Sequence, residues 1–460
     1  MNEENEELEG LRREIRSITT DIILRVQKRM ELSKQIGKIK AERNMNVMDE
    51  KVEQEVRNSI LESSKEVGMD PDFCGRLLNI LLIESVRVQK NQQQFKNLAH
   101  RQTHMNIFTR AKQIEASGKN IIHMEIGEPD YPAPQNLKRV LSESYDLRHY
   151  HYTETTGIKE LRQAIANKVG NHVAADQVMI TVGARFAVFS AIVSLLKAGD
   201  ELISIEPAWP AYKECVNFIG SKNKVIETTL EENWRPNITQ FEEIISANTK
   251  MIVLNYPNNP TGKILDDNTL NKIIQFAKDH DLYILSDEVY SDYAFNGFKS
   301  ILEYNYDKGI MISSFSKGYA MTGFRVGYAI AKDDIIAQMA KIQATALTSV
   351  AEPMQYSALA ALEESPAENV KRIKKRLDIV SDKLRKMSIS FTVPDGAMYV
   401  YPKLKSGVDD ITIVDRLLNL GVAVAPGSAF GDSYKQYIRI SACQPENNLE
   451  KGLNLLNTII

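Results

Sequence analysis

The chain has 460 residues, of which 43% are hydrophobic and 25% are charged, a composition typical of folded globular domains rather than disordered or fibrous proteins. Lys and Arg (57) nearly balance Asp and Glu (60), so the formal net charge of -3 excludes an overall basic field for nucleic acid or anionic membranes. A chain of this length is too long for one compact core and predicts two or three domains.

The cysteines and the N-terminus indicate where the protein acts. Cys74, Cys215 and Cys443 lie far apart without a CxxC pair, which argues against a disulfide framework and a zinc site, so no metal is expected. The N-terminus MNEENEELEG is acidic and lacks an apolar signal core, and no run of about 18 apolar residues follows it. The sequence therefore predicts a cytoplasmic protein.

Residues 1–95 predict an all-α domain. Apolar residues recur near helical spacing from about residue 5 to 43, which indicates one long helix. A second helix is expected between Asp49, a candidate N-cap, and the turn at Gly68. A third is expected from there to the polar tract at 90–94. The first unit is therefore expected to be a three-helix domain.

The remainder, residues 96–460, predicts an α/β domain with a mainly parallel sheet. Its candidate strands are apolar on both faces, as is typical of buried parallel strands, and helical segments between them supply the crossovers. These strands are VMITVG, ELISIEP, MIVLNYP and LYILSDE. We expect a large lobe of about 141–345 and a smaller α+β lobe of about 105–140 and 346–460.

Four motifs follow one another in this second domain. They are TVGARFAV at 181–188, NYPNNPTG at 255–262, SDEVY at 286–290 and SSFSKGYAMTGFRVGY at 313–328. In this order they resemble the fold-type I pyridoxal-phosphate (PLP) enzymes, specifically the class I and II aminotransferases related to aspartate and aromatic aminotransferases. The resemblance covers essentially all of residues 105–460 and implies PLP-dependent transamination.

The resemblance implies roles for residues around the cofactor ring. Lys317 is expected to bind the cofactor as a Schiff base and to move a proton during catalysis. Asp287 is expected to pair with the pyridinium nitrogen and keep the ring protonated. Tyr290 and Asn259 are expected to hydrogen-bond the phenolic oxygen, and Trp209 to stack on the ring face.

The cofactor phosphate needs a nest of donors with positive charge nearby, preferably at a helix N-terminus. TVGARFAV supplies a turn at Gly183 followed by amides that open a helix. Tyr152 matches the tyrosine that reaches the phosphate of a neighbouring subunit's cofactor, which implies a homodimer. The resemblance assigns the phosphate site to Ala184, Arg185, Ser314 and Arg325.

The resemblance also implies how the amino acid or 2-oxo acid is held. Arg439 in YIRIS matches the arginine that binds the α-carboxylate, since a planar guanidinium suits two carboxylate oxygens. The backbone of Gly127 in GEPDYP and the side chain of Asn259 are expected to support the same group. A buried arginine so near the C-terminus would otherwise be costly.

Taken alone, the charged helices of residues 1–95 would be interpreted as a coiled-coil dimerisation arm. Their charges resemble those of the all-helical chorismate mutases, in the same order and spacing. The matching segments are LRREI at 11–15, QKRMEL at 27–32, GKIK at 37–40, Asp49 with Glu53, and ESVRVQ at 84–89.

Chorismate is a dianion that rearranges without a nucleophile or a proton transfer, so the protein must hold a strained conformer and stabilise charge on the breaking ether oxygen. The resemblance assigns the carboxylates to Arg29 and, across a dimer, Arg12. Where the family often has an arginine before the residue matched by Glu53, this chain has Val52, which removes one polar contact. The other expected contacts are Lys40 and Gln89 to the ether oxygen, Asp49 and Glu53 to the ring hydroxyl, and Ser85 to a carboxylate or hydroxyl.

Three functions are compatible with these patterns. The favoured one is a bifunctional enzyme of aromatic amino acid biosynthesis that converts chorismate to prephenate and transaminates phenylpyruvate, 4-hydroxyphenylpyruvate or prephenate with Glu or Asp as donor. The second is an aminotransferase whose helical domain is a non-catalytic dimerisation or metabolite-sensing module. The third, a PLP-binding transcription regulator, should show a basic recognition helix, whereas this N-terminus is long-helical and charge-balanced.

Overall fold

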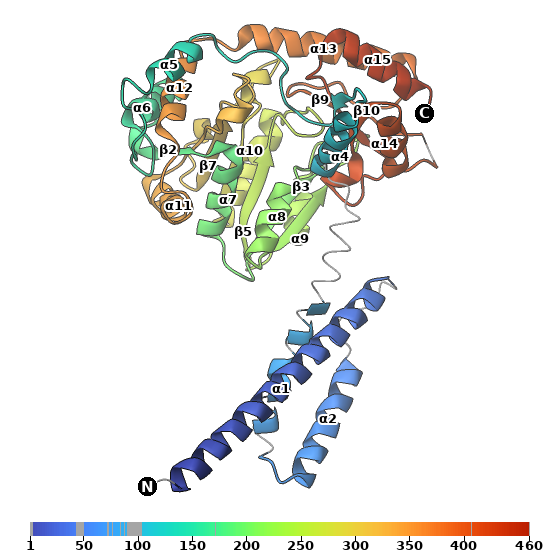
Figure 1. Cartoon of the computed structure of the whole chain (residues 1–460). Coiled ribbons are helices and arrows are strands. Elements are labelled where there is room, and N and C mark those ends of the chain that lie inside the picture. The colour runs from blue at the N-terminus through green and yellow to red at the C-terminus, as the bar shows by residue number, and fades with distance from the viewer. Residues whose placement is uncertain are drawn as a thin grey trace. The chain divides into compact units, whose positions relative to one another are not determined.

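The computed structural model describes residues 3–42, 50–70, 73–75, 77–82, 84–86, 88–89, 104–170, 172–405 and 407–459. The chain divides into two compact units, Met1–Arg101 and Gln102–Ile460 (Figure 1). None of the helices in the described ranges combines the length and the apolar character that crossing a bilayer requires.

The first unit contains the three predicted helices. Helix α1 spans Glu3–Glu42 and α2 spans Glu50–Glu66. Residues 73–75, 77–82, 84–86 and 88–89 are also helical. Gly68, in the turn after α2, has a φ of 67°, which a glycine adopts without steric cost. The expected N-cap Asp49 lies outside the described residues.

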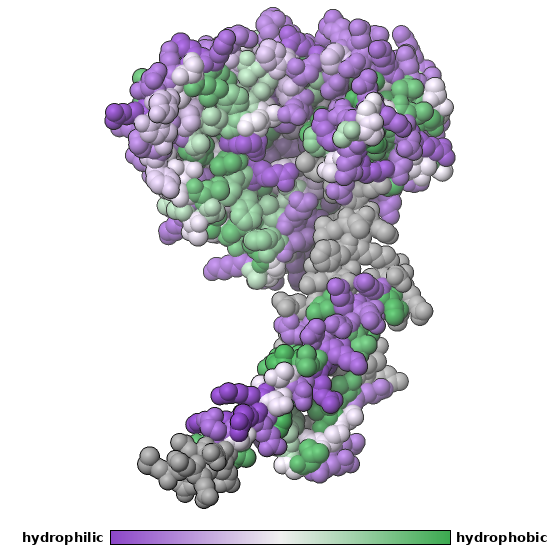
Figure 2. Space-filling model, viewed as in Figure 1, coloured by the Kyte–Doolittle hydropathy of each residue, from purple (hydrophilic) through white to green (hydrophobic). Residues whose placement is uncertain are grey.

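Among the residues of α1 whose burial the structure describes, the fully buried ones, Ser33 and Gly37, lie in the second half. Its first half exposes large apolar side chains, and Ile15 is 64% exposed. Figure 2 shows such side chains on the surface of this unit. Exposed apolar residues of this half include Leu8, Leu11, Ile15, Ile18, Ile22 and Ile23.

The second unit contains a mainly parallel sheet, as the buried apolar runs predicted, and this sheet has seven strands. Its order is β2-β8-β7-β6-β5-β3-β4. Strand β8 pairs antiparallel with both β2 and β7, and the other strand pairs are parallel. The strands are β2 Val178–Thr181, β3 Glu201–Glu206, β4 Lys222–Glu227, β5 Thr249–Asn255, β6 Tyr283–Asp287, β7 Gly309–Ser314 and β8 Gly327–Ile330.

Helices cover both faces of this sheet because its strands are apolar on both faces. On β5, Ile252 and Leu254 pack on one side, and Met251 and Val253 on the other, since alternate residues of a strand point to opposite faces. Helices α6 Lys159–Val169, α9 Ile238–Ile244 and α10 Asp267–Asp279 contribute to the first face. Helices α7 Gly183–Leu195, α8 Ala211–Phe218 and α11 Asp333–Ala346 contribute to the second.

A smaller lobe surrounds a four-stranded sheet with the order β1-β10-β11-β9. Its strands are β1 Ile122–Met124, β9 Tyr399–Val400, β10 Val422–Pro426 and β11 Ile438–Ser441. Its helices are α4 His104–Ala116, α13 Ala367–Lys386, α14 Asp410–Asn419 and α15 Glu446–Asn457, of which α13 and α15 pack together (Figure 1). Short 3-10 helices span Ala175–Gln177, Ser291–Tyr293, Ile301–Tyr304, Thr322–Phe324 and Gly427–Phe430.

One part of the expected small lobe packs elsewhere. Helices α5 Leu137–Glu143 and α12 Glu352–Ala361 pack against each other, and α12 also packs against α6. Val350 and Ala358 belong to the core of the large sheet. The expected lobe boundary near residue 346 is therefore too early, because small side chains let α12 pack closely on the large lobe.

Candidate active site

A cavity of about 280 Å³ lies where β5, β6 and β7 end, the edge at which parallel α/β sheets bind ligands. Its wall includes eleven of the twelve residues expected around the cofactor and the carboxyl group. They are Gly127, Ala184, Arg185, Trp209, Asn259, Asp287, Tyr290, Ser314, Lys317, Arg325 and Arg439. The twelfth, Tyr152, is not part of this wall and is 87% exposed.

One end of the cavity is suited to an anion. Gly183 begins α7 with a φ of 71°, and a Cβ there would lie 3.0 Å from Cζ of Arg325. Surrounding protein and the neighbouring guanidinium of Arg185 hold the pKa of Arg325 below its usual range. No ion pair with either arginine occurs in the part of the chain that the structure describes. Two like charges beside a helix N-terminus favour a phosphate-like ligand.

A flat wall continues from this cradle. The guanidinium of Arg185 lies 4.6 Å from the ring centroid of Trp209, within the range of a cation–π interaction. Trp209 meets Tyr212 edge to face at 5.4 Å. The contacts with Arg185 and Tyr212 fix the orientation of the indole, and an aromatic ligand could stack on it.

Asp287 ends β6 and is 3% exposed. Burial raises the pKa of Asp287 to about 6, while hydrogen bonds from the Tyr212 hydroxyl and the Val289 amide oppose this rise. The Tyr212 oxygen lies 2.6 Å from Oδ2. A buried carboxylate in this setting can pair with a basic nitrogen of a ligand.

Tyr212 is a site residue that sequence reasoning missed. It stands three residues after Trp209 in the same EPAWPAY segment. Trp209 lies just before α8 and Tyr212 lies in its first turn, so the two aromatic residues stand close together in the chain. That spacing was the available signal.

Lys317 follows β7, and its amine donates to the carbonyl of Gly127. Burial is the main reason that the pKa of Lys317 falls to about 8, with Arg439 and Arg325 lowering it further and Cys443 opposing them. A lysine with this pKa is partly neutral near physiological pH. Only the neutral amine is a nucleophile, so the site activates Lys317.

Arg439 on β11 is 2% exposed and has no carboxylate partner among the described residues. Its guanidinium donates to Oδ1 of Asn259 at 2.8 Å and to the carbonyl of Glu125. Its Nε atom is buried without an acceptor in the same part of the chain. An uncompensated buried cation is costly, so this end of the cavity suits a carboxylate ligand.

Tyr290 and Tyr399 join the two halves of the site, and Tyr399 was not expected from the sequence. Their hydroxyl oxygens lie 2.7 Å apart. Burial and the neighbouring Tyr399 raise the pKa of Tyr290 well above its usual range. The Tyr290 hydroxyl therefore stays protonated and can donate a hydrogen bond to a ligand oxygen.

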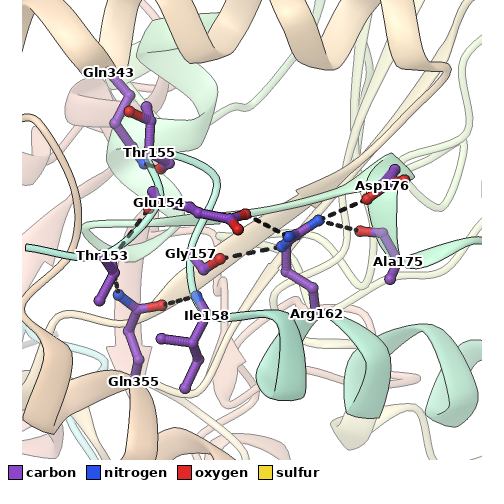
Figure 3. A network of polar contacts seen from close by, with 10 residues as sticks. All are labelled: Thr153, Glu154, Thr155, Gly157, Ile158, Arg162, Ala175, Asp176, Gln343 and Gln355. Carbon is purple, nitrogen blue, oxygen red and sulfur yellow. Dashed lines mark hydrogen bonds and ion pairs between the residues drawn. The ribbon is translucent and has the colours of Figure 1, made fainter. Parts of the chain in front are cut away.

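The segment that carries Tyr152 is held by three buried side chains (Figure 3). From α6, Arg162 donates to the carbonyl of Gly157 at 3.1 Å and to Oε2 of Glu154 at 2.7 Å. Gln343 from α11 and Gln355 from α12 also bond the segment, Gln343 through the Thr155 carbonyl, and both side chains are fully buried. The backbone beside the exposed Tyr152 is thus fixed.

The helical unit brings together some of its expected residues. Arg29 donates to the Leu81 carbonyl at 2.7 Å and to the Ser85 hydroxyl, and burial lowers the pKa of Arg29. Gln89 has a buried Oε1 without a hydrogen bond in the described part of the unit. Ser85, which also bonds Ser33 at 3.1 Å, lies beside Arg29.

The other expected mutase residues are spread along the unit. Arg12 is exposed and pairs with Glu9 at 2.7 Å. Lys40 lies in the last turn of α1 and is partly buried. Asp49 and the side chain of Glu53 lie outside the described residues. No group of three His, Cys, Asp or Glu side chains that could hold a metal occurs in the described ranges.

A second buried acid, Glu288, is expected to make the free energy of unfolding depend on pH. Burial raises the pKa of Glu288 to about 7 from 4.5, against hydrogen bonds from Ile301, Ser300 and Ser286. Since the folded chain holds this proton more tightly, the associated stability is complete below about pH 4.5 and is lost as the pH rises through about 7. We expect Glu288→Gln to stabilise the cofactor-free protein at pH 8 by up to about 3 kcal/mol and much less at pH 5.

Urea unfolding of the cofactor-free protein at pH 5, 6.5 and 8 measures this effect. Glu242→Gln, at an exposed position of α9, is the matched control and should follow the original protein. An unchanged pH dependence in Glu288→Gln would contradict the assignment.

Comparisons with known proteins agree with this geometry. Residues 119–456 match the family model "Aminotransferase class I and II", and residues 11–90 match "Chorismate mutase type II". An aspartate aminotransferase of Thermotoga maritima is 35% identical over 364 residues, which are 77% of this chain and 96% of that protein. Aromatic-amino-acid aminotransferase 2 of Thermococcus litoralis is 32% identical over 370 residues, 77% and 94% of the two chains.

A solved structure is similar as well. The aspartate aminotransferase from Thermus thermophilus with maleate superimposes with a TM-score of 0.75 at 29% identity and covers 78% of this chain and 96% of its own. The chain therefore belongs to the class I and II aminotransferases, enzymes that depend on pyridoxal phosphate, and carries a chorismate mutase type II domain at its N-terminus.

Proposed function

We propose that this chain is a bifunctional enzyme of aromatic amino acid biosynthesis. In this proposal a helical domain of residues 1–95 converts chorismate to prephenate, and residues 96–460 transaminate an aromatic-pathway 2-oxo acid with Glu or Asp as donor. The observation that carries it is one cavity whose wall contains both the Arg185 and Arg325 anion cradle and the buried Arg439, in a chain that also has a mutase domain. The proposed setting is the cytoplasm, and the three cysteines are free thiols.

The cavity residues fit pyridoxal phosphate. The cavity wall brings Arg185 and Arg325 to the N-terminus of α7, which suits a phosphate. The Trp209 indole offers a ring face, and Asp287 is a buried acid for the pyridine nitrogen. Ala184, Arg185, Ser314 and Arg325 would hold the phosphate, and Tyr290 and Asn259 the phenolic oxygen. When bound, the cofactor supplies an electron sink for negative charge at the substrate Cα.

The residues of the chain then have distinct tasks. Arg439 binds the α-carboxylate through its planar guanidinium, with Asn259 fixing its orientation at 2.8 Å. Lys317 takes the proton from Cα of the amino donor in one half-reaction and delivers a proton to the former keto carbon of the 2-oxo acid in the other, which a pKa of about 8 permits near neutral pH. Asp287 keeps its charge when it faces a protonated nitrogen, because an opposite charge lowers its pKa.

In the mutase domain the proposed catalysis is electrostatic. Arg29, beside Ser85, binds a carboxylate of chorismate, and Lys40 and Gln89 donate to the ether oxygen. Arg12 stands 17 positions before Arg29 on α1, a distance of about 25 Å along a helix. One chorismate cannot contact both arginines of the same chain, so the proposed site takes Arg12 from a second copy.

We therefore expect a homodimer, or a larger assembly built from dimers. The exposed apolar half of α1 and the exposed Tyr145, Tyr150 and Tyr152 would be covered by a second copy. Sedimentation equilibrium measures the mass directly, and a fully active monomer would exclude the proposal.

Mixing two variants tests the shared site. Lys317→Ala and Tyr152→Phe chains, each impaired alone, should regain about a quarter of the original transaminase activity when mixed at limiting cofactor, since a mixed dimer has one intact site. Activity equal to the simple average of the two variants would show that Tyr152 serves its own chain or none.

The substrate follows from the fusion. Prephenate leads in one further step to phenylpyruvate or 4-hydroxyphenylpyruvate, and tethering helps only if the second site accepts the product. Each candidate has an α-keto carboxylate for Arg439. We rank the aromatic keto acids first and prephenate a close second, because the ring carboxylate of prephenate needs a further cation.

The test is kcat/KM for phenylpyruvate, 4-hydroxyphenylpyruvate, prephenate, oxaloacetate and pyruvate, with Glu and Asp as donors. We expect an aromatic-pathway acid to be preferred. If pyruvate or a branched-chain keto acid exceeds all of them by more than tenfold, about 1.4 kcal/mol of transition-state preference, the pathway proposal fails. Loss of chorismate in a separate assay distinguishes a catalytic helical domain from a structural or sensing module.

A further inference from the structure

Tyr399 lies in the cavity wall, where it contacts several site residues. It lies on β9 of the small lobe, is 2% exposed and contacts residues from three other parts of the site. None of the proposed steps uses it.

The small sheet sets Tyr399 beside Arg439. Tyr399 pairs with Ser441 on the neighbouring antiparallel strand β11, and Arg439 lies two positions before Ser441. Residues two apart on a strand share a face, so Tyr399 and Arg439 form a diagonal pair on one face of the sheet. The Arg439 guanidinium lies 4.3 Å from the Tyr399 ring centroid, close enough for a cation–π interaction.

The hydroxyl of Tyr399 reaches the large lobe. Its oxygen lies 2.7 Å from that of Tyr290, and the two rings meet edge to face at 5.6 Å. Tyr290 follows β6 closely, so this hydrogen bond links the lobe that carries Arg439 to the lobe that carries Asp287. The ring therefore orients one site residue and the hydroxyl orients another.

The backbone around Tyr399 is shaped to admit it. A Cβ at Gly127 would overlap the Tyr399 hydroxyl and lie 2.7 Å from Cζ of the ring. The carbonyl of Gly127 is also the acceptor for the Lys317 amine. Tyr399 thus packs against the backbone that positions Lys317.

We propose that Tyr399 is a positioning residue that ties the carboxylate-binding Arg439 to the cofactor-binding Tyr290, so that both depend on one side chain. This inference rests on the proposed roles of Arg439 and Tyr290. The two parts of this proposal can be tested separately, because the ring of Tyr399 contacts Arg439 and its hydroxyl contacts Tyr290.

Two variants separate these two parts. Tyr399→Phe keeps the ring under Arg439 and removes the hydroxyl, whereas Tyr399→Leu removes both. The matched control is Tyr401→Phe, since Tyr401 is equally buried in the same lobe and donates to the Gly427 carbonyl at 3.0 Å, outside the cavity wall.

Two measurements on the PLP-loaded full chain test the Arg439 contact and the Tyr290 contact separately, and neither depends on turnover. The first is the dissociation constant of 3-phenylpropionate, a carboxylate probe without a keto group. The second is the pH midpoint of the cofactor's absorbance change, which depends on the donor to its phenolic oxygen.

In Tyr399→Phe we expect the midpoint to rise by roughly half a pH unit, because Tyr290 loses the hydrogen bond that orients it. The dissociation constant should stay within about twofold. In Tyr399→Leu the same midpoint shift should accompany about tenfold weaker binding of the probe, as expected for a lost cation–π contact. Tyr401→Phe should change neither quantity.

An unchanged midpoint in Tyr399→Phe would overturn the link to Tyr290, and the same measurement decides the matter if Tyr399→Leu does not fold. An unchanged dissociation constant of the probe in folded Tyr399→Leu would overturn the link between the Tyr399 ring and Arg439. Arg439→Lys is measured beside them. If it binds the probe normally, the proposed role of Arg439 fails, which is a different outcome from failure of Tyr399.

Discussion

Lys317→Ala should lower transamination by at least about a thousandfold, because the described cavity wall then has no lysine amine to bind the cofactor covalently or to move the Cα proton. Lys317 is the lysine among the described residues of the cavity wall, and its amine lies beside the Gly127 carbonyl. The measurements are steady-state transaminase rates and the absorbance of the lysine-linked cofactor, which should disappear.

Two observations show that Lys317→Ala acts locally. The variant should still bind PLP through the cradle around Arg185 and Arg325, and it should consume chorismate at the original rate. Lys341→Ala, at an exposed position of α11, is the control and should keep its transaminase activity. Near-original turnover in Lys317→Ala would mean that the assignment of this lysine is wrong.

Arg29→Ala and Lys40→Ala should each lower the rate of chorismate loss by about 100-fold or more, since preorganised charge is the main catalytic contribution available to a rearrangement without a nucleophile. Arg29 already lies in a polar setting with the Leu81 carbonyl and Ser85, where a dianion would face less competition from water. Transaminase rates and cofactor affinity should not change in either variant.

The control for the mutase variants is Lys38→Ala. Lys38 is exposed and stands two residues before Lys40, about 200° away around the helix. Because Arg29 also holds two helices together, thermal unfolding of each variant must accompany the rates. Original mutase rates in both Arg29→Ala and Lys40→Ala would identify the helical domain as a structural or sensing arm.

The sequence by itself determined the elements and much of the cofactor cavity. Buried apolar runs marked four of the seven strands, and three of the four motifs overlap or follow one of them, whereas the motif that carries Lys317 begins at the end of β7, which no predicted run marked. Because parallel strands end at one edge of a sheet, the residues after β5, β6 and β7 had to meet there. Asn259, Asp287 and Lys317 line one cavity for this reason.

Local patterns also determined the helical unit, whose three helices and turn at Gly68 were predicted. They did not reveal that the first half of α1 lacks a cover within the described unit. An apolar stripe on a helix indicates only that this face of the helix can be buried. What buries it depends on the rest of the assembly.

Tertiary structure alone decided the contacts between distant segments. Tyr212 meets Asp287 across 75 positions and Tyr290 meets Tyr399 across 109, and no local spacing encodes such pairs. The antiparallel β8 and the packing of α12 on the large lobe also depended on which surfaces met. The pKa of Lys317 falls to about 8 and that of Asp287 rises to about 6 mainly through burial, a property of the folded surroundings that the side chain itself does not possess.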